Sequence, residues 1–573
     1  MSSPDSGGYE IPDTTLFDPA NRPVKVIGIG AGVSGLMMAY KIQTECENVE
    51  LKIYEKNPNV GGTWFENRYP GCDVPAHAYV FPWAPNPEWT SMLAGASEIS
   101  DYLNRVADCF ELRQYIHLNH QVAGCFWDEE RGKWKVKIQI VEPKVDWSSR
   151  EPLSVIREFW DEGDVVLHAT GILNRWSFPN IPGLESFKGR VIHTAGWPDD
   201  YQEQHWKGQN VAVIGSGASS IQVVPKMQKY VEHMDVFART PNWFVQLAGH
   251  RGNNRPCKDQ KLLLLSLLIN MADDPSEREH FRKNPEDLLR HIKETEVMYN
   301  STWDNNIMGT ELQEKAIKMT AEHMRDVVKD DKLLKAITPS FPVSCRRVTP
   351  GDPYLHAIQE PNVDMHFTGA ARITADGVLG EDGTVVKCDT IICATGFDTT
   401  WRPCFPVVGR NGVDLREKWK DAPAAYFGLA CPDMPNWITF LGPNWPVAQG
   451  SIIGAVDANG SYAVKCIKKL QSDWLHSFCP RQDVTDEYNG HTQIWAKKTV
   501  WSQNCRTWYK DLQTGRLTAV YCGHSLHYSE MLSSVRWEDM DIRYTNKYNR
   551  FAFMGIGRPL CQRIDKRWKF ATA

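Results

Sequence analysis

The sequence predicts an α/β protein built from two Rossmann-like dinucleotide-binding domains, with a helical insertion in the second. Two glycine-rich loops carry this prediction, because each lies between a strand-like stretch and a helical pattern. The length agrees with it, since 573 residues are too many for one hydrophobic core.

The first glycine-rich loop lies near the N-terminus. Strand, loop, helix and strand follow one another over residues 24–29, 30–35, 36–42 and 49–54. In this pattern Gly30 permits the tight turn, Gly32 lets the backbone approach a pyrophosphate, and Gly35 lets helix and strand pack closely. Glu55 ends the second strand, where an acid can accept hydrogen bonds from ribose hydroxyls.

The same order returns over residues 210–214, 215–220, 221–227 and 233–238. The expected nucleotide contacts of this second unit are Gly215, Ser216, Gly217, Ser219, Ser220, Arg239 and Thr240. Ser220 replaces the third glycine and is small enough for similar packing. Arg239 stands where the first unit has Glu55, and a guanidinium can clamp a 2′-phosphate that an acid would repel. The second nucleotide is therefore predicted to be NADP(H) rather than NAD(H).

Two different nucleotide signatures indicate one cofactor that is bound permanently and one that binds and dissociates in each turnover. A flavin with a nicotinamide is the natural pair. Two Ala-Thr-Gly segments, at 169–171 and 394–396, are interpreted as crossings between the domains. We expect an FAD-binding domain over 1–165 and 394–573, and an NADP-binding domain over 166–393 with a helical insertion at about 258–336.

Composition narrows the remaining possibilities. The net charge of −6 gives no sign of a nucleic-acid or anionic-membrane partner. The apolar run 262–271 is too short to span a bilayer and is interpreted as a buried helix, with a membrane-touching or substrate-entry helix as the alternative. The 15 cysteines include no CxxC pair, so we expect no disulfide framework, no metal site and a cytoplasmic location. The oligomeric state is not predicted.

Between the two glycine-rich loops lies the pattern FxGxxxHxxxWP, at Phe187, Gly189, His193, Trp197 and Pro198. This segment resembles the fingerprint of type I Baeyer–Villiger monooxygenases, a class of flavin-dependent monooxygenases. The sequence as a whole is similar to fungal members of this class, which often act in secondary metabolism.

Other segments extend the resemblance to about residues 22–545. Residues 61–71 match the family element GGxWxxxxYPG, although two residues are missing between Gly71 and the acid that follows, Asp73. Arg346 and Arg347 match a basic pair whose second member is the active-site arginine of the family, and Arg346 is expected at the 2′-phosphate. Asn444 matches a flavin-contacting loop, and Trp508 a mobile C-terminal tryptophan.

The resemblance implies FAD and NADPH as cofactors, and a ketone and O₂ as substrates. NADPH reduces FAD, O₂ adds to it, and the resulting C4a-peroxyflavin converts the ketone to an ester or lactone. Arg347 would stabilise the developing negative charge, and Asp73 would orient Arg347. His193 would lie in a linker between the domains and couple NADP(H) binding to domain movement. Trp197 would pack against this linker. Further contacts with the flavin are expected from Thr63, Trp64, Phe65, Tyr79 and Val122.

Two alternatives stay open. Related flavin monooxygenases oxidise sulfur or nitrogen. Those enzymes usually have an aromatic and a basic residue at the two positions where this sequence has Trp197 and Pro198. The two-residue shortening before Asp73 also allows an uncoupled NADPH oxidase or a non-catalytic nucleotide-binding relic.

Overall fold

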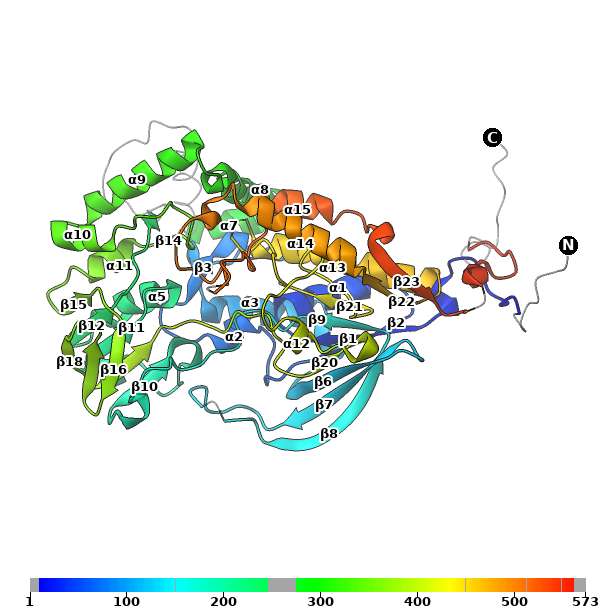
Figure 1. Ribbon diagram of the computed structural model, residues 1–573, viewed down its shortest axis with the longest axis horizontal. Coiled ribbons are helices and arrows are strands. Elements are labelled where there is room, and N and C mark those ends of the chain that lie inside the picture. The colour runs from blue at the N-terminus through cyan, green and yellow to red at the C-terminus, as the bar shows by residue number, and fades with distance from the viewer. Residues whose placement is uncertain are drawn as a thin grey trace.

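The computed structural model describes residues 10–149, 151–245, 275–448, 450–511, 513–547 and 549–560. Its framework is two parallel five-stranded sheets, one near the middle of the molecule and one at the end where β10, β11 and β12 lie (Figure 1). This arrangement confirms the predicted α/β class with two Rossmann-like units.

The first sheet has the order β21, β9, β1, β2, β5, which are Trp437–Thr439, Val165–His168, Val24–Ile29, Val49–Tyr54 and Ile116–His117. β1 and β2 have the bounds that the sequence predicts. β1 is buried along nearly its whole length, and β2 is buried at Leu51, Ile53 and Tyr54. Helix α1 (Val33–Glu45) packs against α13 (Ile452–Ser472), so the N- and C-terminal parts of the chain build one domain.

The second sheet has the order β10, β19, β11, β12, β15, which are Arg190–His193, Thr390–Cys393, Asn210–Ile214, His233–Phe237 and Val363–His366. The predicted strand at 210–214 is confirmed, and the predicted helix begins earlier, as α5 (Ala218–Met227). Helix α11 (Asp352–Ala357) packs on α5.

Smaller sheets flank these two. β20 (Val407–Val408), β6 (His120–Asp128), β7 (Lys133–Val141) and β8 (Val155–Gly163) form a curved sheet that shares a core with the first sheet. β16 (Ala370–Thr374), β17 (Gly377–Gly380) and β18 (Val385–Lys387) cover the second sheet in the same way. β3 (Asp73–Pro75) pairs with β4 (Leu93–Gly95), and β22 (Leu475–Pro480) with β23 (Met540–Tyr544).

Helices occupy the described part of the expected insertion. They are α7 (Pro275–Lys283), α8 (Pro285–Asn300), α9 (Glu311–Val327) and α10 (Asp331–Ile337). The apolar run 262–271 lies outside the described residues. Within the part of the chain that is described, no helix combines the length and apolar character needed to cross a membrane.

The two segments that cross between the sheets lie side by side. Trp176 forms a β-bridge with Phe397, and Arg175 pairs with Asp398. The expected boundary at 165/166 falls inside β9, which pairs with β1, so the first crossing begins after His168. The second crossing follows Cys393, where β19 ends.

One cysteine pair differs from the expectation of free thiols. Cys345 and Cys505 form a disulfide with a Cα–Cα distance of 6.3 Å, across 160 residues of sequence. Because tertiary folding alone brings them together, no local spacing could have revealed the pair.

Candidate active site

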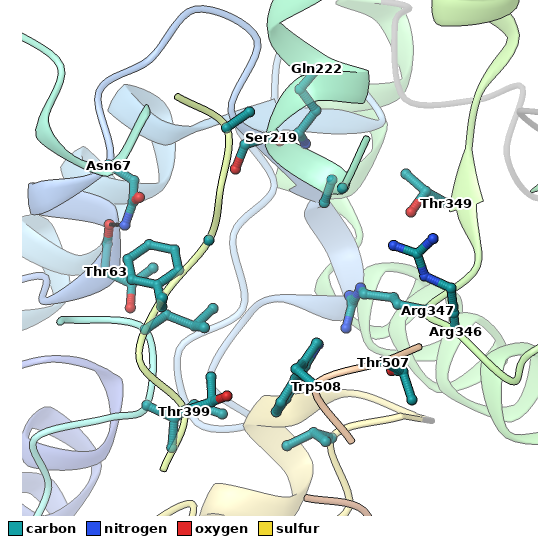
Figure 2. A pocket seen from close by; sticks show the side chains of 18 of the residues that line it. Thr63, Asn67, Ser219, Gln222, Arg346, Arg347, Thr349, Thr399, Thr507 and Trp508 are labelled. Atoms are coloured by element: carbon teal, nitrogen blue, oxygen red, sulfur yellow. Dashed lines mark hydrogen bonds between the residues drawn. The ribbon is translucent and has the colours of Figure 1, made fainter. Parts of the chain in front are cut away.

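A single cavity of about 3490 Å³ extends between the two dinucleotide units. Figure 2 shows Thr63 and Asn67 on one side of it, and Arg346 and Arg347 on the other. It collects most of the residues expected to bind cofactors: Gly30, Gly32, Glu55, Thr63, Trp64, Asp73, Tyr79, Val122, Gly215, Ser216, Gly217, Ser219, Arg239, Thr240, Arg346, Arg347 and Trp508.

Four expected residues do not line the cavity. Gly35 and Ser220 lie behind their loops, where a Cβ on Gly35 would meet the carbonyl of Gly30 and Ser220 is fully buried. Phe65 faces away and packs edge-on against Trp147 at 5.3 Å between ring centroids. Asn444 is buried, and its Nδ2 donates to the carbonyl oxygens of Leu517 and Val520, both at 3.1 Å. Asn444 therefore shapes the loop instead of forming part of the cavity wall.

The first glycine-rich loop is held by Glu55. The Oε2 of this buried carboxylate accepts from the Ala31 amide at 2.7 Å, and its Oε1 accepts from the Asn57 amide at 2.9 Å. Burial raises the pKa of Glu55, and the two amide hydrogen bonds oppose that shift. Each oxygen keeps a lone pair that can accept a ribose hydroxyl.

The two Ala-Thr-Gly segments occupy equivalent places in the two units. A Cβ on Gly30, which has a φ of +103°, would lie 2.7 Å from the carbonyl oxygen of Ala169. A Cβ on Gly215, which has a φ of +124°, would likewise meet the carbonyl of Ala394. Each glycine-rich turn therefore rests on the segment that leaves the neighbouring strand.

The second loop faces a cluster of cations. Ser216 Oγ donates to the Thr240 carbonyl at 2.9 Å, and Arg346 Nη1 donates to the Pro241 carbonyl at 3.0 Å. Burial lowers the pKa of the Arg346 guanidinium, and the positive charge of Arg506 lowers it further. Arg239, Arg346 and Arg506 all line the cavity. Arg506 was not predicted. The only signal for it in the sequence was that it lies two residues before Trp508.

The carboxylate of Asp73 has a different partner from the one expected. Its Oδ1 accepts from Gln222 Nε2 at 2.9 Å, and Gln222 Oε1 in turn accepts from the Tyr69 hydroxyl at 2.7 Å. Among the described residues, Asp73 and Arg347 form no ion pair within 4.0 Å. The expected Asp73–Arg347 contact is thus corrected to a contact with α5. Gly71 also lies so close to this helix that a Cβ there would be 2.6 Å from the Gln222 carbonyl oxygen.

Arg347 lies at the end of the cavity where the C-terminal loop enters. Figure 2 shows its guanidinium directed toward Trp508, while Arg346 extends toward Thr349. Burial raises the pKa of Tyr509, and the charge of Arg347 acts in the opposite direction. The Trp508 ring lies 6.4 Å from that of Trp401, a residue that the sequence reasoning missed.

Trp64 and Tyr79 form an aromatic corner on the flavin-side wall. Their ring centroids are 5.1 Å apart in an edge-on arrangement. Burial raises the pKa of Tyr79 to about 12, so its hydroxyl stays protonated at neutral pH.

The fingerprint residues lie outside the cavity. His193 ends β10 in the second sheet instead of lying in a linker, is fully buried, and stacks on Trp176 at 4.7 Å. Its Nδ1 accepts from the Ala195 amide at 3.1 Å. Trp197 packs in the core of the second unit, with Nε1 donating to the Tyr201 carbonyl at 2.9 Å, so the expected packing in a linker is corrected.

The structure also brings together three groups that could hold a cation, although the sequence predicts no metal site. They are His233, Asp235 and Asp364, on β12 and β15. Both carboxylates already have a histidine partner. His233 Nε2 lies 3.3 Å from Asp364, and His366 Nε2 lies 2.7 Å from Asp235.

Known proteins resemble this chain in sequence and in fold. Residues 29–96 match the family model described as an NAD(P)-binding Rossmann-like domain. The FAD-binding monooxygenase moxY of Dothistroma septosporum is 46% identical over 560 residues, which cover 97% of this chain and 86% of that protein. A Baeyer-Villiger monooxygenase of Streptomyces coelicolor is 32% identical over 511 residues, covering 88% of this chain and 90% of that one. The chain belongs to the Baeyer–Villiger monooxygenase family.

The fold agrees with this membership. The structure of an oxidized steroid monooxygenase bound to NADP matches with a TM-score of 0.72 and 23% identity, covering 91% of this chain and 100% of the other. In this Baeyer–Villiger family member, the fingerprint residues Phe187, Gly189, His193, Trp197 and Pro198 do not line the cavity.

Proposed function

We propose that the protein uses FAD and NADPH to convert a ketone to an ester or lactone. The balanced reaction is ketone + O₂ + NADPH + H⁺ → ester + NADP⁺ + H₂O. The single observation that carries the proposal is one cavity that joins two dinucleotide loops to a permanently charged arginine, Arg347. The cytoplasmic location was inferred from the lack of a disulfide framework, and the Cys345–Cys505 bond removes that argument.

The two loops fit two nucleotides. Helix α1 begins after Gly32 and helix α5 after Gly217, and neither N-terminus has a side-chain cap. Their N–H groups and positive dipole ends are therefore available to pyrophosphates. A Cβ on Gly217 would meet no atom of the protein within 4 Å, which leaves open space in front of the loop.

The bound flavin supplies hydride acceptance from the nicotinamide and activation of O₂. Glu55 would hold the FAD ribose, and Arg239 and Arg346 the 2′-phosphate of NADPH. Arg347 would stabilise the negative charge that develops on the carbonyl oxygen of the ketone, because its guanidinium keeps its charge at any working pH.

Asp73 would contribute through the position of its segment. Its pKa is raised by burial, while the hydrogen bond from Gln222 and the charge of Lys226 lower it. Asp73 would hold the start of β3 against α5. Its negative charge would also balance the cations of the cavity. Trp64, Tyr79 and Trp508 would keep water from the reacting atoms.

The test is NADPH consumption with cyclic, linear, aryl and polycyclic ketones, with mass detection of a gain of one oxygen. We expect product from at least one ketone class, and amines or sulfides added in parallel should not be the preferred substrates. A colourless protein that takes up no flavin would refute the proposal. NADPH consumption that produces only hydrogen peroxide with every ketone would show an oxidase instead.

Arg347→Ala should retain flavin reduction by NADPH and lose ester formation by roughly 10²–10³-fold, the cost of removing one preorganised charge-stabilising donor. Arg347→Lys keeps the charge and should recover part of the yield. Stopped-flow absorbance measures the reduction, and product analysis the yield. Full ester yield from Arg347→Ala would remove Arg347 from this role.

A further inference from the structure

The Cys345–Cys505 disulfide joins the two segments that place cations and an aromatic wall at one end of the cavity. Arg346 and Arg347 directly follow Cys345 in the sequence. Arg506, Thr507 and Trp508 directly follow Cys505. All five of these following residues line the cavity, and Figure 2 shows the two segments facing each other.

The noncovalent contacts between these segments are sparse and partly repulsive. Trp501 Nε1 donates to the Ser344 carbonyl at 3.1 Å, and Tyr509 is buried near Arg347. Against these contacts, Arg506 lies close enough to Arg346 to lower the pKa of its guanidinium. Two guanidinium groups close enough to interact in this way repel each other, which favours separation of the two segments. A covalent bond between Cys345 and Cys505 opposes that repulsion directly.

We propose that the Cys345–Cys505 disulfide is a positioning element of the oxygenation reaction. It keeps Arg347 and Trp508 together, and its cleavage lets NADPH oxidation run without oxygen insertion. This inference rests on the proposed function for its effect on product. Cys345 is fully buried and Cys505 is 7% exposed, so the intact bond is shielded from thiol reductants in solution.

Formation of the bond is a balanced two-electron oxidation. The two thiols lose two electrons and two protons, and hydrogen peroxide accepts them to become two waters. Uncoupled turnover would itself supply this oxidant, because NADPH + H⁺ + O₂ gives NADP⁺ + H₂O₂. An enzyme with the bond reduced would therefore generate the peroxide that restores it.

The test compares Cys505→Ser, Cys345→Ser and the double variant with the wild type, all purified as flavin-loaded protein without reductant. Cys109→Ser is the matched control, since Cys109 is an exposed free thiol outside the cavity. Peptide mass mapping without reduction should find the 345–505 link in the wild type and in Cys109→Ser. Each cysteine variant at 345 or 505 should reduce its flavin at saturating NADPH at a rate within about twofold of the wild type, because hydride transfer does not need Arg347. Its ester yield per NADPH should fall at least threefold, and its peroxide should rise to match.

Hydrogen exchange gives a readout that does not depend on turnover. Amides of residues 505–511 should exchange at least tenfold faster in Cys505→Ser than in Cys109→Ser. Free thiols at both positions in wild-type protein after peroxide treatment would overturn the proposal, as would unchanged exchange and coupling in the double variant. If the wild type has the link but oxidises no ketone, the proposed function fails, and the exchange comparison alone then decides the role of the link.

Discussion

At the scale of single residues, the side chain that ends the second strand of each unit distinguishes the two nucleotide sites. Glu55 is buried and tied to its own loop by two amide hydrogen bonds. Arg239 is exposed and lines the cavity beside Thr240. A buried acid with spare lone pairs suits a ribose diol, whereas an exposed guanidinium suits a phosphate.

Arg239→Ala should therefore raise the KM for NADPH about ten- to a hundredfold, the range for losing one or two charge-assisted hydrogen bonds. The KM for NADH should change less than about twofold, because NADH has no 2′-phosphate. Steady-state kinetics with both nucleotides measure the difference. Arg190→Ala is the control, since Arg190 pairs with Asp200 outside the cavity. Equal effects on the two nucleotides would contradict the phosphate clamp.

Asp73→Asn should weaken oxygenation and leave thermal stability equal or higher at neutral pH. The hydrogen bond from Gln222 can persist, because an amide oxygen also accepts. Burial raises the pKa of Asp73, so the native state binds this proton more readily than the unfolded state does. The ionised carboxylate therefore costs stability at neutral pH, and that cost disappears as the pH falls below both pKa values.

Tm scans of wild type and Asp73→Asn from pH 7 to pH 4 measure this dependence. The gap between the two proteins should close toward acid, while ester yield per NADPH at pH 7 falls, because Asn lacks the negative charge that balances the cavity cations. A gap that widens toward acid would reverse the assigned direction of the pKa shift.

The residue scale also shows where sequence reasoning stops. The motifs indicated which residues reach the cavity but not which side chains bond to each other. Asp73 was expected beside Arg347, and the structure pairs it with Gln222 instead. The contact accompanies a close approach of Gly71 to α5, where a Cβ would lie 2.6 Å from the Gln222 carbonyl oxygen. No propensity or period in the sequence describes such a packing.

At the scale of elements, the buried parallel strands were the most predictable part. β1, β2 and β11 have the predicted bounds. β1 and β11 are nearly continuous buried runs, whereas β2 alternates apolar and charged residues before its buried end at Ile53 and Tyr54. The strand β9 and the edge strand β10 were misjudged. β9 was divided by the expected domain boundary, and β10 was interpreted as linker because a short fingerprint segment gives little strand signal.

Helix α8 shows how one element attaches to the flavin-side domain. It contacts the turn at His77, whose ring lies 4.7 Å from that of His291. Burial, together with the smaller effect of the positive charge that His291 acquires on protonation, lowers the pKa of His77 to about 3. A native histidine with a depressed pKa stays neutral while the unfolded chain takes up a proton. The free energy of unfolding therefore falls as the pH drops below about 6.5.

His77→Phe should remove about 2 kcal/mol of the stability lost between pH 7 and pH 5, because one buried neutral histidine no longer opposes folding. His77→Gln serves as the second nontitrating variant and separates charge from ring size. Denaturant unfolding at the two pH values measures the loss, and hydrogen exchange in α8 locates it. An unchanged pH dependence in both variants would exclude His77 as the source.

At the scale of the whole molecule, the two dinucleotide units are joined at several places. The crossing segments pair through Arg175 and Asp398, and Gln222 of the second unit holds Asp73 of the first. The disulfide adds a covalent tie between the segment before β14 (Thr349–Pro350) and the C-terminal loop. These contacts fix how the two nucleotide loops face one cavity, which the order of motifs along the chain does not specify.

The disulfide should also stabilise the whole fold, because it restricts the unfolded chain. In the chain-entropy model, a bond that closes a loop of 160 residues contributes about 5 kcal/mol at 25 °C. Spread over the unfolding entropy of a chain of this length, that corresponds to a Tm lower by about 4 °C in Cys505→Ser. Calorimetry without reductant, with Cys109→Ser as the control, measures the shift. Wild type that is unfolded and refolded with a thiol reductant should have the lower Tm, and the same treatment should leave Cys505→Ser unchanged, since only the wild type has the bond to lose.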